Sequence, residues 1–102
     1  MSMPKPENEK KRLLLTVVYP DRPAEKLFCD AVTITIMDNE KGRGGGLYGI
    51  RPGHAPALFA LECGKAEARS DGSTVFARTL GAGYAKAADN VVTIVTESGA
   101  GD

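Results

Sequence analysis

The sequence has no tryptophan, one histidine and two cysteines among its 102 residues. Cys29 and Cys63 stand far apart without a CxxC motif, and His54 is the one imidazole available to help them bind a metal. This is too small a ligand set for a typical zinc site. We therefore predict two small buried thiols in a reducing compartment, and no metal or other cofactor.

Long hydrophobic runs and an excess of one charge are missing as well. Charged residues, Gly or Pro interrupt every apolar stretch before it reaches the roughly 18 residues that a membrane helix needs, so direct membrane insertion is not expected. The 13 Lys and Arg balance the 13 Asp and Glu, which argues against general nucleic-acid binding through phosphates. Residues 1–12 lack the apolar core of a secretory signal and are expected to form a flexible N-terminal arm.

The sequence does contain 12 Gly and 6 Pro, which are spread along the whole chain. This spacing limits every element to a short length and favours strands joined by turns. Residues 32–36 alternate cleanly between apolar side chains and threonine, and the pairs 71–72 and 89–90 predict hairpin turns. The pattern predicts an all-β domain over residues 13–97, a flattened sandwich or barrel of about ten short antiparallel strands. Residues 98–102 are expected to be a frayed end.

Two segments, residues 57–62 and 85–88, have helical propensity. Each of them lies within reach of a Gly or Pro and is too short for a stable helix, so we predict strands there too. The expected core, with the opposite-face neighbours as the alternative, contains Leu13, Leu15, Val17, Val32, Ile34, Ile36, Val75, Val91 and Val95.

Two motifs resemble sites of chemistry. Residues 44–49 match G-x-G-x-x-G, but Pro52 and Gly53 prevent the helix on which phosphate binding by that motif depends. His54 lies between turn residues, and neither a recognisable nucleophile motif nor a paired carboxylate accompanies it as a triad would require. The residues by themselves therefore indicate a binding or structural module rather than an enzyme.

Three segments together, in this order along the chain, carry a resemblance: LTVVYPDR at 15–22, GIRPGHAPAL at 49–58, and GAGYA at 81–85 with NVVTI at 90–94. They resemble the epsilon subunit of F-type ATP synthases, specifically its N-terminal β-domain, over about residues 13–97. The resemblance implies a sandwich of ten strands at the foot of the central stalk, touching the gamma subunit and the ring of c subunits. It also implies a protein without catalysis of its own, peripheral to the membrane on its cytoplasmic face, which couples rotation during ion-driven ATP synthesis.

The resemblance also selects candidate interface residues. They are the turn residues Gly49, Pro52, Gly53, His54, Ala55 and Pro56, together with Lys41 and Arg43 in a Gly-rich loop whose family counterpart approaches the c-ring. Two roles remain open for His54, contact with the gamma subunit or tying the turn together. Arg51 stands where the family has an apolar residue, and we expect it to be exposed.

The sequence ends where the family normally continues into a helical hairpin that can bind ATP. We therefore expect the chain neither to hydrolyse ATP nor to bind it tightly. A different reading is a stand-alone β-barrel that binds oligonucleotide or sugar, which would need a strip of exposed aromatic and basic residues. The chain has three Phe, three Tyr and no Trp for this purpose. A small hydrolase that uses His54 is a third alternative.

Overall fold

The computed structural model describes residues 12–37 and 46–97, and all regular structure in these ranges is β-strand. The predicted all-β fold is confirmed, with nine strands in the described ranges where about ten were expected. Residues 1–11 of the predicted arm and the predicted frayed end at 98–102 lie outside the described residues. The strands are β1 (Leu13–Val18), β2 (Glu25–Cys29), β3 (Ala31–Ile36), β4 (Gly46–Ile50), β5 (Ala57–Leu61), β6 (Gly64–Ser70), β7 (Ser73–Leu80), β8 (Gly83–Ala88) and β9 (Val91–Thr96).

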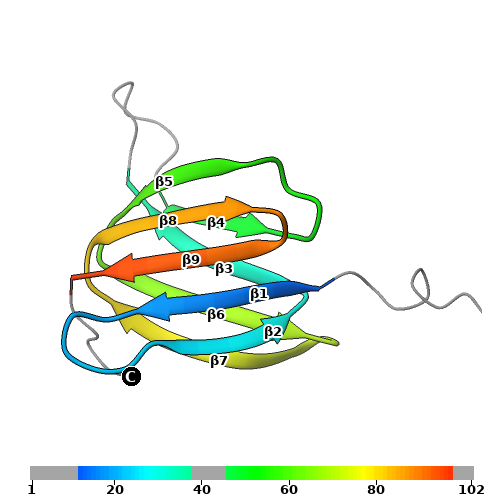
Figure 1. Ribbon diagram of the computed structural model, residues 1–102, viewed down its shortest axis with the longest axis horizontal. Helices are drawn as coiled ribbons and strands as arrows, with labels where there is room; N and C mark the ends of the chain where they lie inside the picture. Colours follow the sequence, from blue (N-terminus) through cyan, green and yellow to red (C-terminus); the bar gives the residue numbers. More distant parts are fainter. Residues whose placement is uncertain (1–11, 38–45, 98–102) are drawn as a thin grey trace, which may run out of the picture.

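One sheet folds over on itself to make the two layers of the sandwich. Its strand order is β2-β1-β9-β8-β5-β3-β6-β7, and β4 pairs with β3 off this path. β5 reaches β3 through a single residue pair, Leu61 opposite Ile36, and the sheet changes layer there. In Figure 1 the layer β2-β1-β9-β8-β5 lies in front of the layer β4-β3-β6-β7. The predicted flattened sandwich is thus confirmed.

One strand pair corrects the prediction that all pairing is antiparallel. β1 and β9 run parallel, with Leu14 opposite Val91 and Val18 opposite Val95. Strands joined by a short hairpin must run antiparallel, whereas a parallel pair needs a long connection. β1 and β9 are the first and last strands, so the rest of the domain supplies that connection.

The two predicted hairpins are present and have the same kind of turn. Asp71 and Gly72 join β6 to β7 with φ angles of 53° and 82°, and Asp89 and Asn90 join β8 to β9 with φ angles of 52° and 63°. Positive φ at both central residues is the signature of a type I′ turn, whose twist matches that of the flanking strands.

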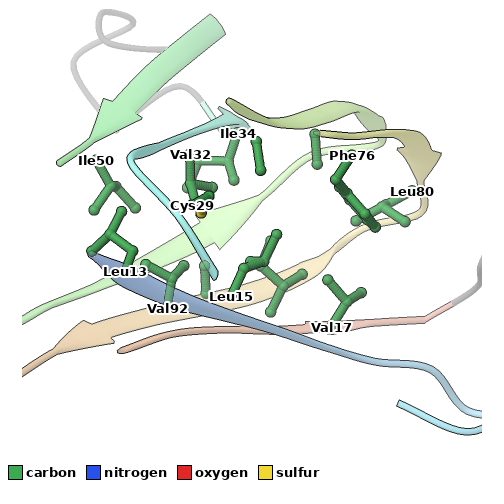
Figure 2. Packing of buried hydrophobic residues seen from close by; sticks show 14 of the residues in the cluster. Leu13, Leu15, Val17, Cys29, Val32, Ile34, Ile50, Phe76, Leu80 and Val92 are labelled. Atoms are coloured by element: carbon green, nitrogen blue, oxygen red, sulfur yellow. The ribbon is translucent and has the colours of Figure 1, made fainter. Parts of the chain in front are cut away.

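The core lies between the two layers and is built from alternate residues of each strand (Figure 2). The largest fully buried side chains are Leu13, Leu15, Val17, Cys29, Val32, Ile34, Ile50, Val92 and Ile94. The core prediction is confirmed for β1 and most of β3, where Ile36 is only half-buried. In β7 and β9 the alternative face is the buried one, so that Phe76, Val92 and Ile94 point inward while Val75 and Val91 are exposed.

The two cysteines differ, which corrects the prediction that both are buried. Cys29 ends β2 inside the core, and burial raises the pKa of its thiol. Cys63 is exposed, because it lies in the bend between β5 and β6 where the chain passes around the outside of the core. Both thiols are free.

Candidate interaction surface

The turn between β4 and β5 brings the predicted interface residues of segment 49–56 together on the surface. Gly53 has a φ of 86°, a conformation that favours glycine. Its amide donates a hydrogen bond to Oδ1 of Asn90 at 2.7 Å, and the amide of His54 donates to the carbonyl of Arg51 at 3.1 Å. Pro52 and His54 are half-buried, and the exposed residues are Gly49, Arg51, Gly53, Ala55 and Pro56. The exposure predicted for Arg51 is therefore confirmed.

His54 uses both ring nitrogens. Nδ1 lies 2.7 Å from the carbonyl oxygen of Ala55, and Nε2 lies 2.9 Å from the hydroxyl of Tyr48. A carbonyl can only accept, so in the neutral ring Nδ1 carries the proton and Nε2 accepts from Tyr48. The ring also stands edge-on to Phe59, with the centroids 6.1 Å apart. His54 thus ties the turn to β4 and β5, which is one of its two predicted roles.

An apolar depression lies beside this turn. Leu58, Phe59, Ala60 and Tyr84 line it, and its volume is about 440 Å³; we call these four residues the β5 patch. Ala60 lies opposite Tyr84 in the pairing of β5 with β8. The exposed fractions of Leu58 and Tyr84 are 70% and 49%. On the other face of β5, the ring of Phe59 packs against Tyr48 at 4.8 Å and against His54, so β5 joins the turn to the patch.

Two further apolar side chains are exposed in β4 and just after β3. Leu47 precedes Tyr48 in β4 and is 71% exposed, and the amide of Met37 donates to the carbonyl of Ala60 at 3.1 Å. Four of the seven large apolar side chains exposed in the described ranges, those of Met37, Leu47, Leu58 and Tyr84, therefore lie along β4, β5 and their neighbours. The contiguous part of this apolar surface is the β5 patch, and a contiguous exposed apolar patch is typical of a surface that another molecule covers.

Leu47, Leu58 and Tyr84 were not among the predicted interface residues. A signal for Leu58 and Ala60 was available: residues 57–61 are apolar at every position, although alternate residues of a strand point to opposite faces. A continuous apolar run of this kind is typical of a strand that is covered on both faces. Lys41 and Arg43, which were predicted to belong to the same interface, lie outside the described residues.

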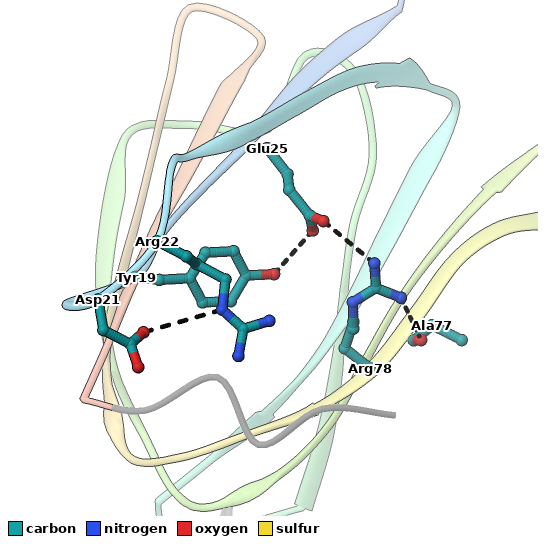
Figure 3. Close-up of polar contacts among 6 residues, drawn as sticks. All are labelled: Tyr19, Asp21, Arg22, Glu25, Ala77 and Arg78. Atoms are coloured by element: carbon teal, nitrogen blue, oxygen red, sulfur yellow. Dashed lines mark hydrogen bonds and ion pairs between the residues drawn. The ribbon is translucent and has the colours of Figure 1, made fainter.

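The opposite side of the sandwich carries a polar cluster between β2 and β7 (Figure 3). The hydroxyl of Tyr19 donates to Oε1 of Glu25 at 2.7 Å, and the guanidinium of Arg78 donates to Oε2 at 3.0 Å. The hydrogen bond from Tyr19, together with Arg78, holds the pKa of the Glu25 carboxyl below its usual value. Burial raises the pKa of Tyr19, and the bond to Glu25 raises it further. Glu25 and Arg78 are two-thirds buried, and their ion pair joins the two end strands of the sheet.

The described ranges show how the residues considered for metal, phosphate and nucleic-acid binding are arranged. No group of three or more His, Cys, Asp or Glu side chains there is placed to hold a metal ion. The described part of the G-x-G-x-x-G match, from Gly46 onward, is strand β4 rather than the start of a helix. The two exposed aromatic side chains, Phe28 and Tyr84, are separated by β1 and β9 and form no continuous strip. Residues 12–37 and 46–97 contain no helix that is long and apolar enough to span a membrane.

Comparison with known proteins gives the family. The sequence profile described as "ATP synthase, Delta/Epsilon chain, beta-sandwich domain" matches residues 13–100. The chain belongs to this family. Within it, the chain is 34% identical over 86 residues to the ATP synthase epsilon chain of Lawsonia intracellularis, and 32% identical over 91 residues to that of Synechococcus elongatus. These matches cover 84% of this chain but 59% and 57% of the two relatives, so the chain spans under two thirds of their length.

Solved structures of ATP synthases contain chains with the same fold. A chain of the mitochondrial ATP synthase of Euglena gracilis, from a structure of its OSCP, F1 and c-ring, matches with a TM-score of 0.67 at 26% identity. That match covers 83% of this chain and 50% of the Euglena chain. A chain from the central stalk and c-ring of the Tetrahymena thermophila enzyme matches with a TM-score of 0.63 over 87% of this chain and 66% of its own length. At 17% identity, the Tetrahymena chain supports the fold alone.

Proposed function

We propose that this chain is the epsilon subunit in the central stalk of an F-type ATP synthase. The match to the delta/epsilon β-sandwich family over residues 13–100 carries the proposal, and the two epsilon-chain relatives support it. The similar Euglena chain belongs to an assembly that contains F1 and a c-ring. By this proposal the chain sits at the cytoplasmic face of an energy-coupling membrane, bound to the gamma subunit and the c-ring.

The proposed role is mechanical. A body fixed between two parts of a rotor transmits torque only if it does not deform, and three features favour stiffness. All nine strands pair in one folded sheet, the hairpins use tight type I′ turns, and the Glu25–Arg78 ion pair links the two end strands. A rigid surface also loses little conformational entropy on docking, which favours binding. Catalysis is left to other subunits, and this one couples rotation to ion-driven ATP synthesis.

We assign the gamma-facing surface to the turn at 49–56 and the adjoining β5 patch. The turn supplies a fixed backbone with exposed Gly53, Ala55 and Pro56, and the patch supplies apolar area centred on Leu58 and Tyr84. An apolar centre is typical of the fully buried core of a protein interface. The contact of Lys41 and Arg43 with the c-ring remains a prediction from the family resemblance.

Direct binding tests the assignment. The full chain is titrated by calorimetry with purified gamma subunit from the same organism, and separately with its c-ring and with millimolar ATP. Saturable one-to-one binding to gamma and no heat with ATP are expected. A chain that is folded, yet binds neither gamma nor the c-ring, would overturn the proposed function.

His54→Ala then separates the two roles of the histidine. Loss of its bonds to Tyr48 and Ala55 is expected to lower the melting temperature, since about 1 kcal/mol per hydrogen bond is lost. If His54 also contacts gamma, the variant binds more weakly at temperatures where it is fully folded. Unchanged affinity in the folded variant would restrict His54 to the structural role.

A further inference from the structure

Asn90 contacts the turn at 49–56 although it lies far from it in the sequence. Its side-chain Oδ1 accepts the amide of Gly53 at 2.7 Å, and its main-chain carbonyl accepts the amide of Leu14 at 2.9 Å. One residue of the β8–β9 hairpin therefore holds both the start of β1 and the centre of the exposed turn. Leu13, Ile50, His54, Asn90 and Val92 line a common packed junction at this point, with no room for a water molecule.

Asparagine at position 90 has two separate roles, one in the backbone of the hairpin and one through its side chain. Asn90 has a φ of 63°, which Gly, Asn and Asp adopt more readily than other residues. Glycine would satisfy the backbone but has no side-chain oxygen for the amide of Gly53. The β8–β9 hairpin can form without that oxygen. The side-chain oxygen of Asn90 therefore serves the turn at 49–56 rather than the hairpin.

The bond acts on the most adaptable residue of the turn. Gly53 itself has a φ of 86°, and a glycine can leave such a conformation without steric cost. Its flanking residues are constrained, since Pro52 has a fixed φ and His54 is held by Tyr48 and Ala55. Fixing the amide of Gly53 therefore removes the main remaining freedom of the backbone that we assign to the gamma contact.

We propose that Asn90 is a positioning residue for docking: its Oδ1 fixes the amide of Gly53 and thereby holds the turn in the conformation that the partner recognises. This inference rests on the proposed function, which makes the turn a contact for gamma. Asn90 need not touch the partner itself. Its contribution is that the turn is ordered before binding, so less conformational freedom is lost in the complex.

Two substitutions at position 90 and one at its neighbour test the inference. Asn90→Gly keeps the left-handed backbone and the main-chain carbonyl but removes Oδ1, whereas Asn90→Asp keeps an acceptor oxygen. Asp89→Gly is the matched control, because it places glycine at the other positive-φ position of the same hairpin. For each variant of the full chain we would measure the melting temperature, amide hydrogen exchange at Gly53 by NMR, and affinity for purified gamma.

The inference predicts a specific pattern. In Asn90→Gly the Gly53 amide exchanges at least about tenfold faster, because its acceptor is gone. The affinity for gamma falls by about three- to tenfold, as the cost of ordering the turn moves to the binding step. Asn90→Asp keeps the Gly53 exchange rate and the gamma affinity close to wild type, and Asp89→Gly changes neither of them.

The outcomes that overturn it are distinct from failure of the proposed function. Unchanged Gly53 exchange in Asn90→Gly would show that Oδ1 does not hold the turn. Faster exchange with unchanged gamma affinity would show that the held conformation is irrelevant to docking. If the wild-type chain itself fails to bind gamma, the proposed function falls and the docking role of Asn90 falls with it, whatever the exchange rates show.

Discussion

The two sides of the sandwich where the layers meet, β2 with β7 and β4 with β5, differ in the side chains that bridge the layers. Between β2 and β7, Tyr19 and Arg78 converge on the carboxylate of Glu25, so polar groups bond to one another across the gap. Between β4 and β5, the rings of Tyr48 and Phe59 pack at 4.8 Å, while Leu58 on the outer face stays 70% exposed. The β2–β7 side is closed by polar groups that bond to one another, although Phe28 and Val75 are exposed there, whereas the β4–β5 side has no such cluster in the described ranges and carries the apolar depression.

Edge strands invite pairing with other chains, and proteins usually blunt them with charges or coverings. The β2–β7 side is covered in this way at both ends. The Glu25–Arg78 ion pair closes one end. At the other end, the amide of Asp30 donates to the carbonyl of Arg69 at 2.8 Å, and the carboxylate of Asp30 accepts the amide of Asp71 at 2.7 Å. The β4–β5 side, which lacks comparable ion pairs within the described ranges, is the one we expect a partner to cover.

The largest effect is expected where β8 begins, at the border of the β5 patch. A Cβ at Gly83 would collide with the carbonyl oxygen of Val95 and approach Cα of Thr96 to 2.9 Å. Gly83→Ala must push β8 away from β9, and it should cost at least about 3 kcal/mol of unfolding free energy. Chemical denaturation measures the loss. Gly49→Ala is the control, since a Cβ there meets no atom within 4 Å; equal destabilisation of both would refute the packing argument.

The comparison of the two sides predicts a second effect, on binding. Leu58→Glu places a charge in the β5 patch, and we expect gamma affinity to fall at least about tenfold, which corresponds to 1.4 kcal/mol. Phe28→Glu is matched to it in exposure, 61% against 70%, but Phe28 stands on β2 at the other side. It should bind gamma normally. Equal losses in both variants, each checked for folding, would place the interface elsewhere.

Opening the polar side should cost less. Arg78→Met retains most of the side-chain length but removes the donor to Glu25, and about 1 kcal/mol of stability should be lost, because solvent screens a pair that is one-third exposed. Gamma affinity should not change. A double-mutant cycle with Glu25→Gln isolates the pair, and a coupling energy near zero would show that the ion pair does not hold β2 to β7.

The same cluster should make stability depend on pH. The pKa of Glu25 is lowered in the folded state, first by the bond from Tyr19 and then by Arg78, so its contribution is present above the ordinary carboxyl pKa of 4.5 and is lost as pH falls below it. Unfolding free energies measured from neutral pH down to about pH 3 should fall less steeply in Glu25→Gln than in wild type. Identical slopes would contradict the assigned cause.

The smallest effect concerns the rate at which β2 opens, reported by the two thiols. Cys63 is exposed and should react at once with a thiol reagent, whereas Cys29 is buried at the end of β2 and should react only when the strand opens. Arg78→Met should speed the labelling of Cys29 without affecting Cys63. Labelling of Cys29 as fast as that of Cys63 in wild type would show that the polar side is not closed.

Much of the architecture followed from local chemistry in the sequence. Turns at Asp71-Gly72 and Asp89-Asn90 were predictable because few residues accept positive φ, and a strand at 85–88 was expected because that run is too short for a stable helix. The family itself was recognisable from three short segments, at 15–22, 49–58 and 81–94. Each of these signals lies within a few neighbouring residues, where backbone sterics decide the outcome.

The candidate surface was predictable only in part. The turn with His54 was expected, but the bond from Gly53 to Asn90 joins segments far apart in the sequence, and no spacing rule reveals it. The same holds for the β5 patch, where Tyr84 from β8 meets Leu58 and Ala60 from β5 through strand register. Register depends on which strands pair, and the prediction did not include the pairing order.

The sequence by itself determined which residues alternate, where the chain must turn and which family it belongs to. The tertiary structure decided which of two alternating faces is buried, as in β9, where Val92 and Ile94 point inward rather than Val91 and Val95. Both faces of that strand are apolar, so its own pattern could not choose. The choice is made by contact with the opposite layer, and only the folded sheet supplies that contact.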